Sequence, residues 1–542
     1  MTMMALKMSY NRDSHSYKET TRQYGGEREM MSKGDEASGK KDGIHIIRTP
    51  ALGRPFRLGM LYDRVHDTII PGETVLTMAD MEKHIYTQEK KGCSFDVIYG
   101  DSYEEKSRVF NGDANLKLNV LFGIVSLGSS GKFLKSNTSS KKQLRVTLTA
   151  EYTMLYKELE MKQFQSLISN TKTNATHIVT AIEYGTNVAF TFDRTISDEE
   201  NEFEVRGELG GMAKFIGLIN SSAKAELGMK QISMKKADKI SCKFYGDIIL
   251  PVNPTTYEEA VRVYKELPSY LKKDEAVPVT IWLYPLKEGV MPTNKVTQPI
   301  NKENMKQAVM TLDDLQRIYV SCNDLISGQA VMHIPILQDK IDHFRRSVQT
   351  FQEKFKEQVL DGLLKEDDPS KKKMSPWMVA IGNMKNWISQ TVDIEMNLLS
   401  ICIDEIGEKK IEILPKSSVD AKLFEHDSVI ILDIALPFSS GQYVTKENVT
   451  NPQGTTQQQK SWYTDASIKA FVRKTVKRFL NLKSTKARCF EFFVTFTDRE
   501  DTIPQAKIPD YARVVFYKNG EEKRDIDLFS DEAVEMLSTE TR

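Results

Sequence analysis

The stretch EVRGELGGMAKFIGLINSSAKAELGM, residues 204–229, satisfies two secondary-structure periods at once. At every second position it is apolar or small, and the positions between are mostly polar, which is the pattern of a strand with one apolar face. At steps of three and four, the apolar residues also line one face of a helix. The alternating apolar set includes Val205, Leu209, Phe215, Ile219 and Leu227.

A second segment, DANLKLNVLFGIVSLGSSGKFL at residues 113–134, alternates in the same way. Its polar positions include Asn115, Lys117 and Asn119. Its apolar positions are Leu116, Leu118, Val120, Phe122 and Ile124. The chain therefore holds two segments whose pattern fits a strand with one apolar face.

Length and composition favour several soluble domains. The chain has 542 residues, 40% hydrophobic and 28% charged, and Lys plus Arg equal Asp plus Glu at 75 each. This balance gives no net field that would attract nucleic acid or an anionic membrane. The five cysteines form no CxxC pair, and no run of about twenty apolar residues predicts a spanning helix.

Composition and hydrophobic period divide the chain into four regions. Residues 1–44 are a polar, Gly- and Lys-rich tail that we expect to be disordered. Residues 45–290 are rich in strands, and residues 291–408 have a helical period. Residues 409–542 alternate strand and helix and end in a hairpin at Asn519-Gly520. The fold class expected is multidomain α+β.

Motifs for familiar chemistry are missing from the sequence. No HExxH, GxxxxGK[ST], GxSxG or GxGxxG motif is present. We interpret Asp433 as a polar group at the end of a strand and the pair Asp313-Asp314 as a helix cap, in preference to catalytic carboxylates. We therefore expect no enzyme, no cofactor, no metal site and no small-molecule substrate.

Several segments within residues 50–290 resemble the stonustoxin and neoverrucotoxin family of fish lytic toxins. They occur in the family's order: PALGRPFRLGMLYD (50–63), IIPG (69–72), LFGIVSLGSSGKFL (121–134), THIVTAIEYGTNVAFTFD (176–193), ISCKFYGDIIL (240–250) and VTIWLYPL (279–286). The resemblance implies a MACPF/CDC-like (perforin-like) domain over residues 45–290, with helical clusters flanking a bent central sheet. It also implies a focal-adhesion-targeting-like helical bundle over 291–408 and a thioredoxin-like domain over 409–542.

This sequence departs from the family and from active thioredoxins in two places. The stretch ALPFSSGQY (435–443) has no cysteine where a redox motif would follow the first central strand, so we expect a packing module without oxidoreductase activity. The family toxins carry a PRY-SPRY domain after the thioredoxin-like one, and this sequence ends at Arg542 without it.

The resemblance explains the double periodicity. In perforin-like proteins two helical clusters uncoil into β-hairpins that close into a barrel in the membrane, so each segment must suit both helix and strand. We expect hairpins from residues 102–142 and 201–239. Polar stretches at Ser129-Ser130-Gly131 and Asn220-Ser221-Ser222 are the expected tips.

A signature motif of perforin-like domains is also partly present. Tyr184, Gly185 and Thr186 resemble its Tyr-Gly-Thr-His on a central strand, with Asn187 in place of the histidine. No Gly-Gly pair follows at the usual short distance. Gly210 and Gly211 lie further along the chain and are candidates for the backbone bend.

Two functions remain open on this evidence. The first is a pore-forming cytolysin that self-associates, or joins a homologous chain, and inserts hairpins into a lipid membrane. The second is a non-lytic intracellular scaffold built from the same domains. Without a Sec-type signal, the localisation expected is either secretion by another route or the cytoplasm.

Overall fold

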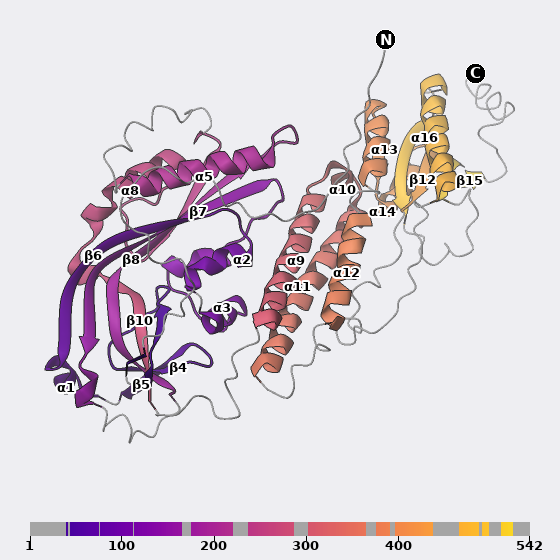
Figure 1. Cartoon of the computed structure of the whole chain (residues 1–542). Coiled ribbons are helices and arrows are strands. Elements are labelled where there is room, and N and C mark those ends of the chain that lie inside the picture. Colours follow the sequence, from indigo (N-terminus) through magenta and orange to yellow (C-terminus); the bar gives the residue numbers. More distant parts are fainter. Residues whose placement is uncertain are drawn as a thin grey trace, which may run out of the picture.

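The computed structural model describes residues 40–41, 44–74, 76–111, 113–164, 175–219, 237–286, 302–364, 375–390, 396–436, 465–486, 490–497 and 511–523, and the structural statements below refer to these residues. A large bent sheet with its helices is followed by long helices and then by a smaller sheet (Figure 1). Most of the expected tail lies outside the described residues, but at its end β1 (Lys40–Lys41) pairs with β2 (Ile44–His45).

The large sheet has eight strands, all within the region 45–290 that the sequence predicted to be rich in strands. Strand β8 pairs with β7 along most of its length, and β7 pairs in turn with β6. The strands are β3 (Ile47–Pro50), β4 (Met60–Asp63), β5 (Thr68–Thr74), β6 (Ile85–Ile98), β7 (Gln143–Leu159), β8 (His177–Thr195), β9 (Ile240–Gly246) and β10 (Val277–Pro285).

The sheet changes partners at the signature motif in β8. Strand β10 pairs with β8 up to Gly185, and β9 pairs with it from Val188 onward. A side chain at Gly185 would place its β-carbon 1.8 Å from the carbonyl oxygen of Tyr152, and the β7–β8 register shifts directly opposite, between Thr153 and Leu155. Glycine is thus required here for the two backbones to approach at an irregularity in the sheet.

Helices cover both faces of this sheet. On what we call the outer face, Val97, Leu148 and Phe190 pack against α5 (Glu202–Leu218) and α8 (Tyr257–Tyr270). On the opposite, inner face, Ile98 and Ala189 pack against α3 (Ala114–Leu121). Shorter elements complete the domain: α1 (Met78–Glu82), α2 (Tyr103–Lys106), η1 (Ser107–Phe110), η2 (Ser130–Lys135), η3 (Met161–Gln163) and η4 (Lys273–Glu275).

Helix α8 is capped at its N-terminus. The hydroxyl group of Thr256 accepts from the backbone N–H of Glu259, and the Glu259 carboxylate accepts from the backbone N–H of Thr256. This reciprocal pair is a capping box. The hydroxyl group of Tyr257 donates to the carbonyl oxygen of Met212 at 3.1 Å, so α8 holds α5 as well as the sheet.

Long helices follow the large sheet, as the change of period predicted. Helix α9 lies beside α11 and α12, and Leu312, Phe351 and Trp377 belong to one buried cluster among them. The helices are α9 (Lys302–Ile326), α10 (Gln329–His333), α11 (Pro335–Leu364), α12 (Ser375–Gln390) and α13 (Met396–Glu408). Their assignment to a focal-adhesion-targeting-like bundle remains a prediction.

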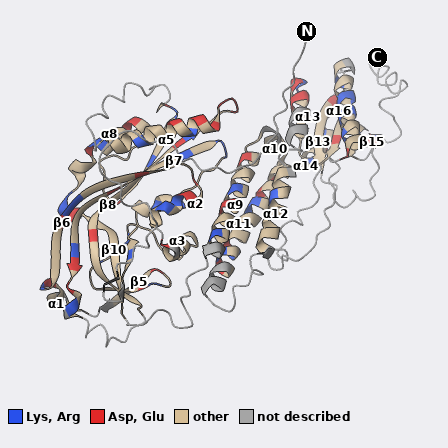
Figure 2. Ribbon diagram, viewed as in Figure 1, with Lys and Arg blue, Asp and Glu red and all other residues tan. Residues whose placement is uncertain are grey.

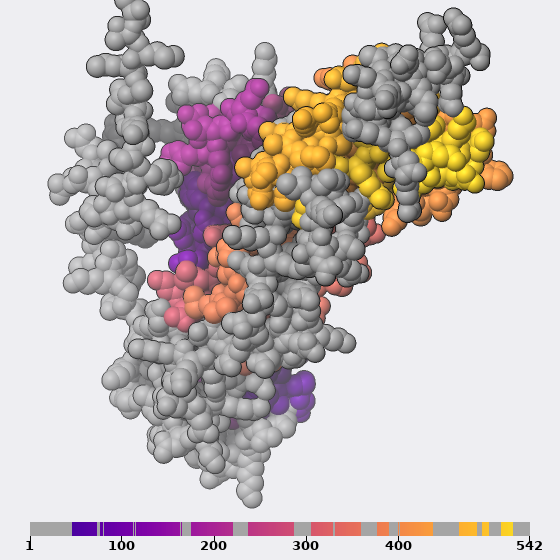
Figure 3. Space-filling model, turned by 90° about the vertical axis from the view of Figure 1, so that its right-hand side faces the viewer, coloured from indigo at the N-terminus to yellow at the C-terminus, as the bar shows by residue number. Residues whose placement is uncertain are grey.

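The C-terminal part is a five-stranded mixed sheet in the order β11-β13-β12-β14-β15. Two apolar runs of the sequence form β12 (Ser428–Ala435) and β13 (Glu491–Thr497), which are parallel and buried. The remaining elements are β11 (Glu412–Leu414), α14 (Lys416–Glu425), α16 (Ala466–Lys486), β14 (Ala512–Lys518) and β15 (Glu521–Lys523). Figure 3 shows this part, in orange and yellow, on the side away from the large sheet.

The predicted hairpin at Asn519-Gly520 is confirmed. Both residues have positive φ, 52° and 80°, as a two-residue hairpin turn requires. The thioredoxin-like assignment stays a prediction, and most of the stretch 435–443 lies outside the described residues. Charges of both signs are spread over the elements of the chain (Figure 2).

Candidate membrane-inserting segments

The first candidate segment, residues 102–142, leaves the sheet at the end of β6 and returns to it at the start of β7. In this state it forms α2, η1, α3 and η2 on the inner face. Leu116 and Val120 of α3 are buried in one cluster with Phe110, Phe133 and Ile98 of the sheet. The apolar positions of the segment are therefore covered in part by the sheet itself.

The other side of the first segment is covered by the long helices. Leu118, Leu121 and Phe122 belong to the cluster formed by α9 and α11. The ring of Phe122 stacks on that of Phe355 with centroids 6.3 Å apart. The backbone N–H of Tyr103 donates to the Asp313 carboxylate at 2.7 Å, so α9 also holds the first residue of α2.

Asp313 is thus part of a contact between domains, where the sequence had suggested only a helix cap. Burial raises the pKa of its carboxyl group above the usual value, and its hydrogen bonds from the backbone N–H groups of Tyr103 and Glu104 oppose that rise. At the end of the segment, the N–H of Lys141 donates to Asp324 of α9 at 2.9 Å. Helix α9 therefore binds both ends of the first segment.

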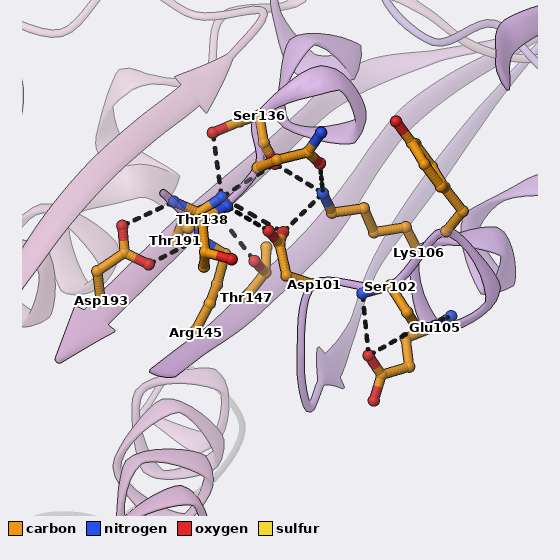
Figure 4. A network of polar contacts seen from close by, with 12 residues as sticks. Asp101, Ser102, Glu105, Lys106, Ser136, Thr138, Arg145, Thr147, Thr191 and Asp193 are labelled. Atoms are coloured by element: carbon orange, nitrogen blue, oxygen red, sulfur yellow. Dashed lines mark hydrogen bonds and ion pairs between the residues drawn. The ribbon is translucent and has the colours of Figure 1, made fainter. Parts of the chain in front are cut away.

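A buried polar network, which we call the clasp, ties both ends of the first segment to the sheet (Figure 4). The ammonium group of Lys106 contacts Asp101 Oδ1 at 2.6 Å and donates to the Ser136 carbonyl oxygen at 2.6 Å. Arg145 of β7 donates to the same Ser136 oxygen at 2.9 Å and forms an ion pair with Asp193 of β8. The clasp closes the segment at its base, because it joins residues before α2 to residues after η2.

Each charge in the clasp has a partner. Asp101, Asp193, Lys106 and Arg145 are two acids and two bases in mutual contact. Burial lowers the pKa of Lys106, and the nearby carboxylate of Asp101 opposes that shift. Opening the clasp exchanges these interactions for water, so its net stabilisation is smaller than its hydrogen bonds alone imply.

A second polar network holds the start of α3. Asp113 caps the helix through the N–H of Leu116 at 3.0 Å, and it accepts from Thr49 at 2.7 Å and from Arg64 at 2.6 Å. Asn119 donates to Asp67 at 2.8 Å. Asn119, which the strand pattern assigned to its polar face, and the cap residue Asp113 therefore hold the helical form in place.

The second candidate segment, residues 201–239, leaves β8 and returns in β9, and its described helix α5 lies on the outer face. Leu209, Met212, Ala213 and Ile216 are buried against the sheet. A β-carbon at Gly210 would lie 2.0 Å from Cε1 of Tyr99, so the helix meets the end of β6 at close range. The returning part of the segment, 220–236, lies outside the described residues.

The predicted inserting residues divide by burial as follows. Leu116, Leu118, Val120, Phe122, Val205 and Leu209 are buried; Ile124, Phe215 and Ile219 are partly exposed; and Leu227 lies outside the described residues. Tyr184, Gly185 and Thr186 lie in β8 as expected, whereas Gly210 and Gly211 lie within α5. In this state the glycine pair is therefore helical and is not part of the sheet.

The clasp residues were missed by sequence reasoning. Arg145 and Asp193 are single charges inside apolar strand runs, and that was the available signal. Their pairing follows from the β7–β8 register, which places them directly opposite each other. Lys106 and Asp101 are close in sequence, but nothing in the sequence shows that they meet Ser136 and Arg145, because that contact forms only when the segment folds back.

Among the described residues, no group of three or more His, Cys, Asp or Glu side chains could hold a metal ion. None of the described helices is both long enough and apolar enough to span a membrane.

The bent sheet, with a helical segment on each face, defines a MACPF/CDC-like domain, and comparison with known proteins agrees. Residues 46–271 match the family described as SNTX, MACPF/CDC-like domain. The chain is homologous to stonustoxin and to related cytolytic toxins, and the family resemblance read from the sequence is confirmed.

Three relatives illustrate the homology. Stonustoxin subunit beta of Synanceia horrida is 29% identical over 83% of this chain and 68% of that protein. Neoverrucotoxin subunit alpha of Synanceia verrucosa is 32% identical over 56% of this chain and 44% of that protein. The solved structure of stonustoxin has a TM-score of 0.65 and 24% identity over 89% of this chain and 69% of that one, which shows a shared fold.

Proposed function

We propose that this protein is a pore-forming subunit that associates with copies of itself, or with a homologous chain, and inserts two β-hairpins into a lipid membrane. The hairpins form from residues 102–142 and 201–239. The proposal needs no catalytic residue, cofactor, metal, nucleic acid or small-molecule substrate. Apolar burial in lipid and hydrogen bonds between subunits would drive the conversion.

One observation carries the proposal. Each segment connects two strands that are already antiparallel neighbours. The first segment connects β6 with β7, and the second connects β8 with β9. Such a segment can convert into a hairpin by lengthening an existing ladder, without any change of topology. A closed barrel of these hairpins would satisfy the backbone groups that lipid leaves unpaired.

The soluble state supports the proposal because it hides the apolar residues of the first segment. The sheet covers Leu116 and Val120, and α9 with α11 covers Leu118 and Phe122. Conversion would therefore require the segment to separate from both covers. The clasp and the contacts to Asp313 and Asp324 would hold the segment until a membrane or a neighbouring subunit competes for it.

The partner proposed is a second chain of the same family. Several relatives are named as alpha and beta subunits of one toxin, which supports association with a homologous chain or with itself. The contact between subunits would extend the sheet at its edges, since closure is what removes open strand edges.

The test is dye release from liposomes and erythrocytes with α5 locked to the sheet. Tyr99→Cys with Gly210→Cys places two cysteines where the ring of Tyr99 now meets the Gly210 backbone, and Cys93→Ser removes the exposed free thiol. The control pair, Ser428→Cys with Lys518→Cys, joins directly opposed residues of β12 and β14, far from both segments.

We expect the Tyr99–Gly210 lock to stop release, reduction to restore it, and the control pair to have no effect. Release that continues with α5 locked would contradict insertion of the second segment. A chain that permeabilises no membrane, alone or with a homologous subunit, would support the non-lytic scaffold instead.

A further inference from the structure

The sheet register at the base of each segment determines how a hairpin would continue from it. At the first segment Ile98 is opposite Thr147, and at the second Arg194 is opposite Ile240. If the ladders lengthen without a slip, each further pair is found by stepping one residue outward on both strands. A slip of one residue would move every side chain to the other face, so this register fixes which residues share a face.

For the first segment, stepping outward from Ile98–Thr147 brings together Leu116 with Ser129, Leu118 with Leu127, and Val120 with Val125. The turn then falls at Phe122-Gly123. Gly123 already has positive φ, 83°, which a tight hairpin turn demands. This position differs from the tip expected at Ser129-Ser130-Gly131.

Alternation from Ile98 assigns these residues to faces. Ile98 is on the inner face, so Phe110, Leu116, Leu118, Val120 and Phe122 continue on that face. Asn115, Lys117 and Asn119 fall on the outer face, where the acid Asp113 comes opposite the base Lys132. The returning strand adds Val125, Leu127 and Phe133 to the inner face, whereas Ile124, which was predicted to insert, falls on the outer face together with Leu134.

The second segment gives the same face from an independent register. Ala189 of β8 is on the inner face, and alternation continues that face through Val205, Leu209, Ala213 and Phe215. The outer face receives Glu204, Arg206, Glu208 and Lys214. The turn of this hairpin falls at Gly217. Each register could have placed the alternating apolar residues on the outer face, but both registers place them on the inner face.

We propose that the inner face of the lengthened sheet is the surface that meets the hydrocarbon interior of a lipid bilayer, and that the outer face lines the aqueous lumen. This inference rests on the proposed function and adds the lipid-facing residues, the strand register and the tips. The apolar stripes from Phe110 to Phe122 and from Phe203 to Phe215 have equal length. Each exceeds the about 9–11 residues that a spanning strand needs.

The assignment also gives α9 and α11 a role. They cover Leu118 and Phe122, which are two of the residues assigned to lipid. The inner face becomes charged toward the base of the first hairpin, at Lys106, Arg108 and Lys135, which places the membrane surface near Phe110. The clasp at Asp101 and Lys106 then lies outside the bilayer.

The test uses four single-cysteine variants of the full chain, made in a Cys93→Ser, Cys489→Ser background and labelled with the environment-sensitive dye NBD. Ser126→Cys and Ser129→Cys replace two exposed serines in the first segment, and Gly207→Cys and Glu208→Cys replace two exposed residues of α5. The remaining cysteines, Cys242, Cys322 and Cys402, are buried. Vesicles of phosphatidylcholine and cholesterol carry nitroxide-labelled lipid, and iodide serves as the aqueous quencher.

We expect the labels at 129 and 207 to shift to shorter emission wavelength and to be quenched by nitroxide lipid, while those at 126 and 208 are quenched by iodide. A tip at Ser129-Ser130-Gly131 would instead put 126 in lipid, because the outgoing strand would then continue past Phe122. That result, or 208 in lipid in place of 207, overturns the register while hairpin insertion stands. Four labels that stay in water, without dye release, overturn the proposed function and this inference with it.

Discussion

Arg145 and Asp193 face each other across β7 and β8 as a two-point ion pair. Arg145 Nε lies 2.6 Å from Asp193 Oδ1, and Nη2 lies 2.8 Å from Oδ2. Both side chains are buried, and the second Nη of Arg145 reaches the Ser136 carbonyl oxygen and Asp101. The two-point contact of the clasp therefore lies within the sheet, and the first segment is attached to Arg145 through Ser136.

Removing Asp193 should destabilise the domain, because Arg145 would keep a buried charge with a poorer set of partners. We expect Asp193→Ala to lower the free energy of unfolding by about 3 kcal/mol, the lower end of the range for breaking a buried pair. Urea unfolding measures it. Asp198→Ala breaks the exposed pair with Lys142 and should change stability by less than about 0.5 kcal/mol. Equal effects of the two variants would contradict a structural role for the clasp.

Asp313 and its neighbour Asp314 allow a matched test of the contact between α9 and α2. Asp313→Ala removes the acceptor of the Tyr103 N–H, which costs about 1–3 kcal/mol for a buried donor left unpaired. We expect faster trypsin cleavage at the lysines of residues 102–142, read by mass spectrometry. Asp314→Ala breaks two ion pairs with exposed or half-exposed partners, Lys385 and Arg317, and should leave the cleavage rate unchanged. Identical digestion of both variants would show that α9 does not hold the segment.

The adjacent glycines of α5 should respond in opposite directions to the same substitution. Gly210→Ala pushes a methyl group into the ring of Tyr99, an overpacking that costs about 1–3 kcal/mol. Nothing lies within 4 Å of a β-carbon at Gly211, so Gly211→Ala should stabilise the helix by about 0.5–1 kcal/mol. Hydrogen exchange of the α5 amides measures both changes. Slower exchange in Gly210→Ala would contradict the observed packing.

Acid should affect the native chain and an Asp313→Asn variant differently. Burial raises the pKa of Asp313 in the folded state, so between the usual value of 3.8 and that raised value the folded chain binds more protons than the unfolded chain. The contribution of Asp313 to stability therefore falls as pH rises through this window. We expect the stability of the native chain relative to Asp313→Asn to be greater at acidic than at neutral pH, in urea unfolding at a series of pH values. A pH-independent difference would contradict the raised pKa.

The sequence by itself determined the periodic features of this protein. Local alternation specifies β7 and β8, and a capping box with a helical period specifies α8. The Asn519-Gly520 turn specifies the last hairpin, because few residue pairs accept positive φ twice. The two segments for which we propose conversion were visible for the same reason, since a period is a property of neighbouring residues. The pattern of these segments is compatible both with their helical state here and with the strands proposed for the membrane.

The tertiary structure alone decided what holds those segments in place. Lys106 meets Ser136 only after the chain reverses, and Asp313 meets Tyr103 across more than two hundred residues of sequence. The register that assigns a face to each residue is likewise fixed by pairing between distant strands. Charge pairing and register depend on distance in space, which one sequence does not contain. Periodicity therefore indicates the segments for which we propose a change of state, and tertiary contacts determine which interactions that change would break.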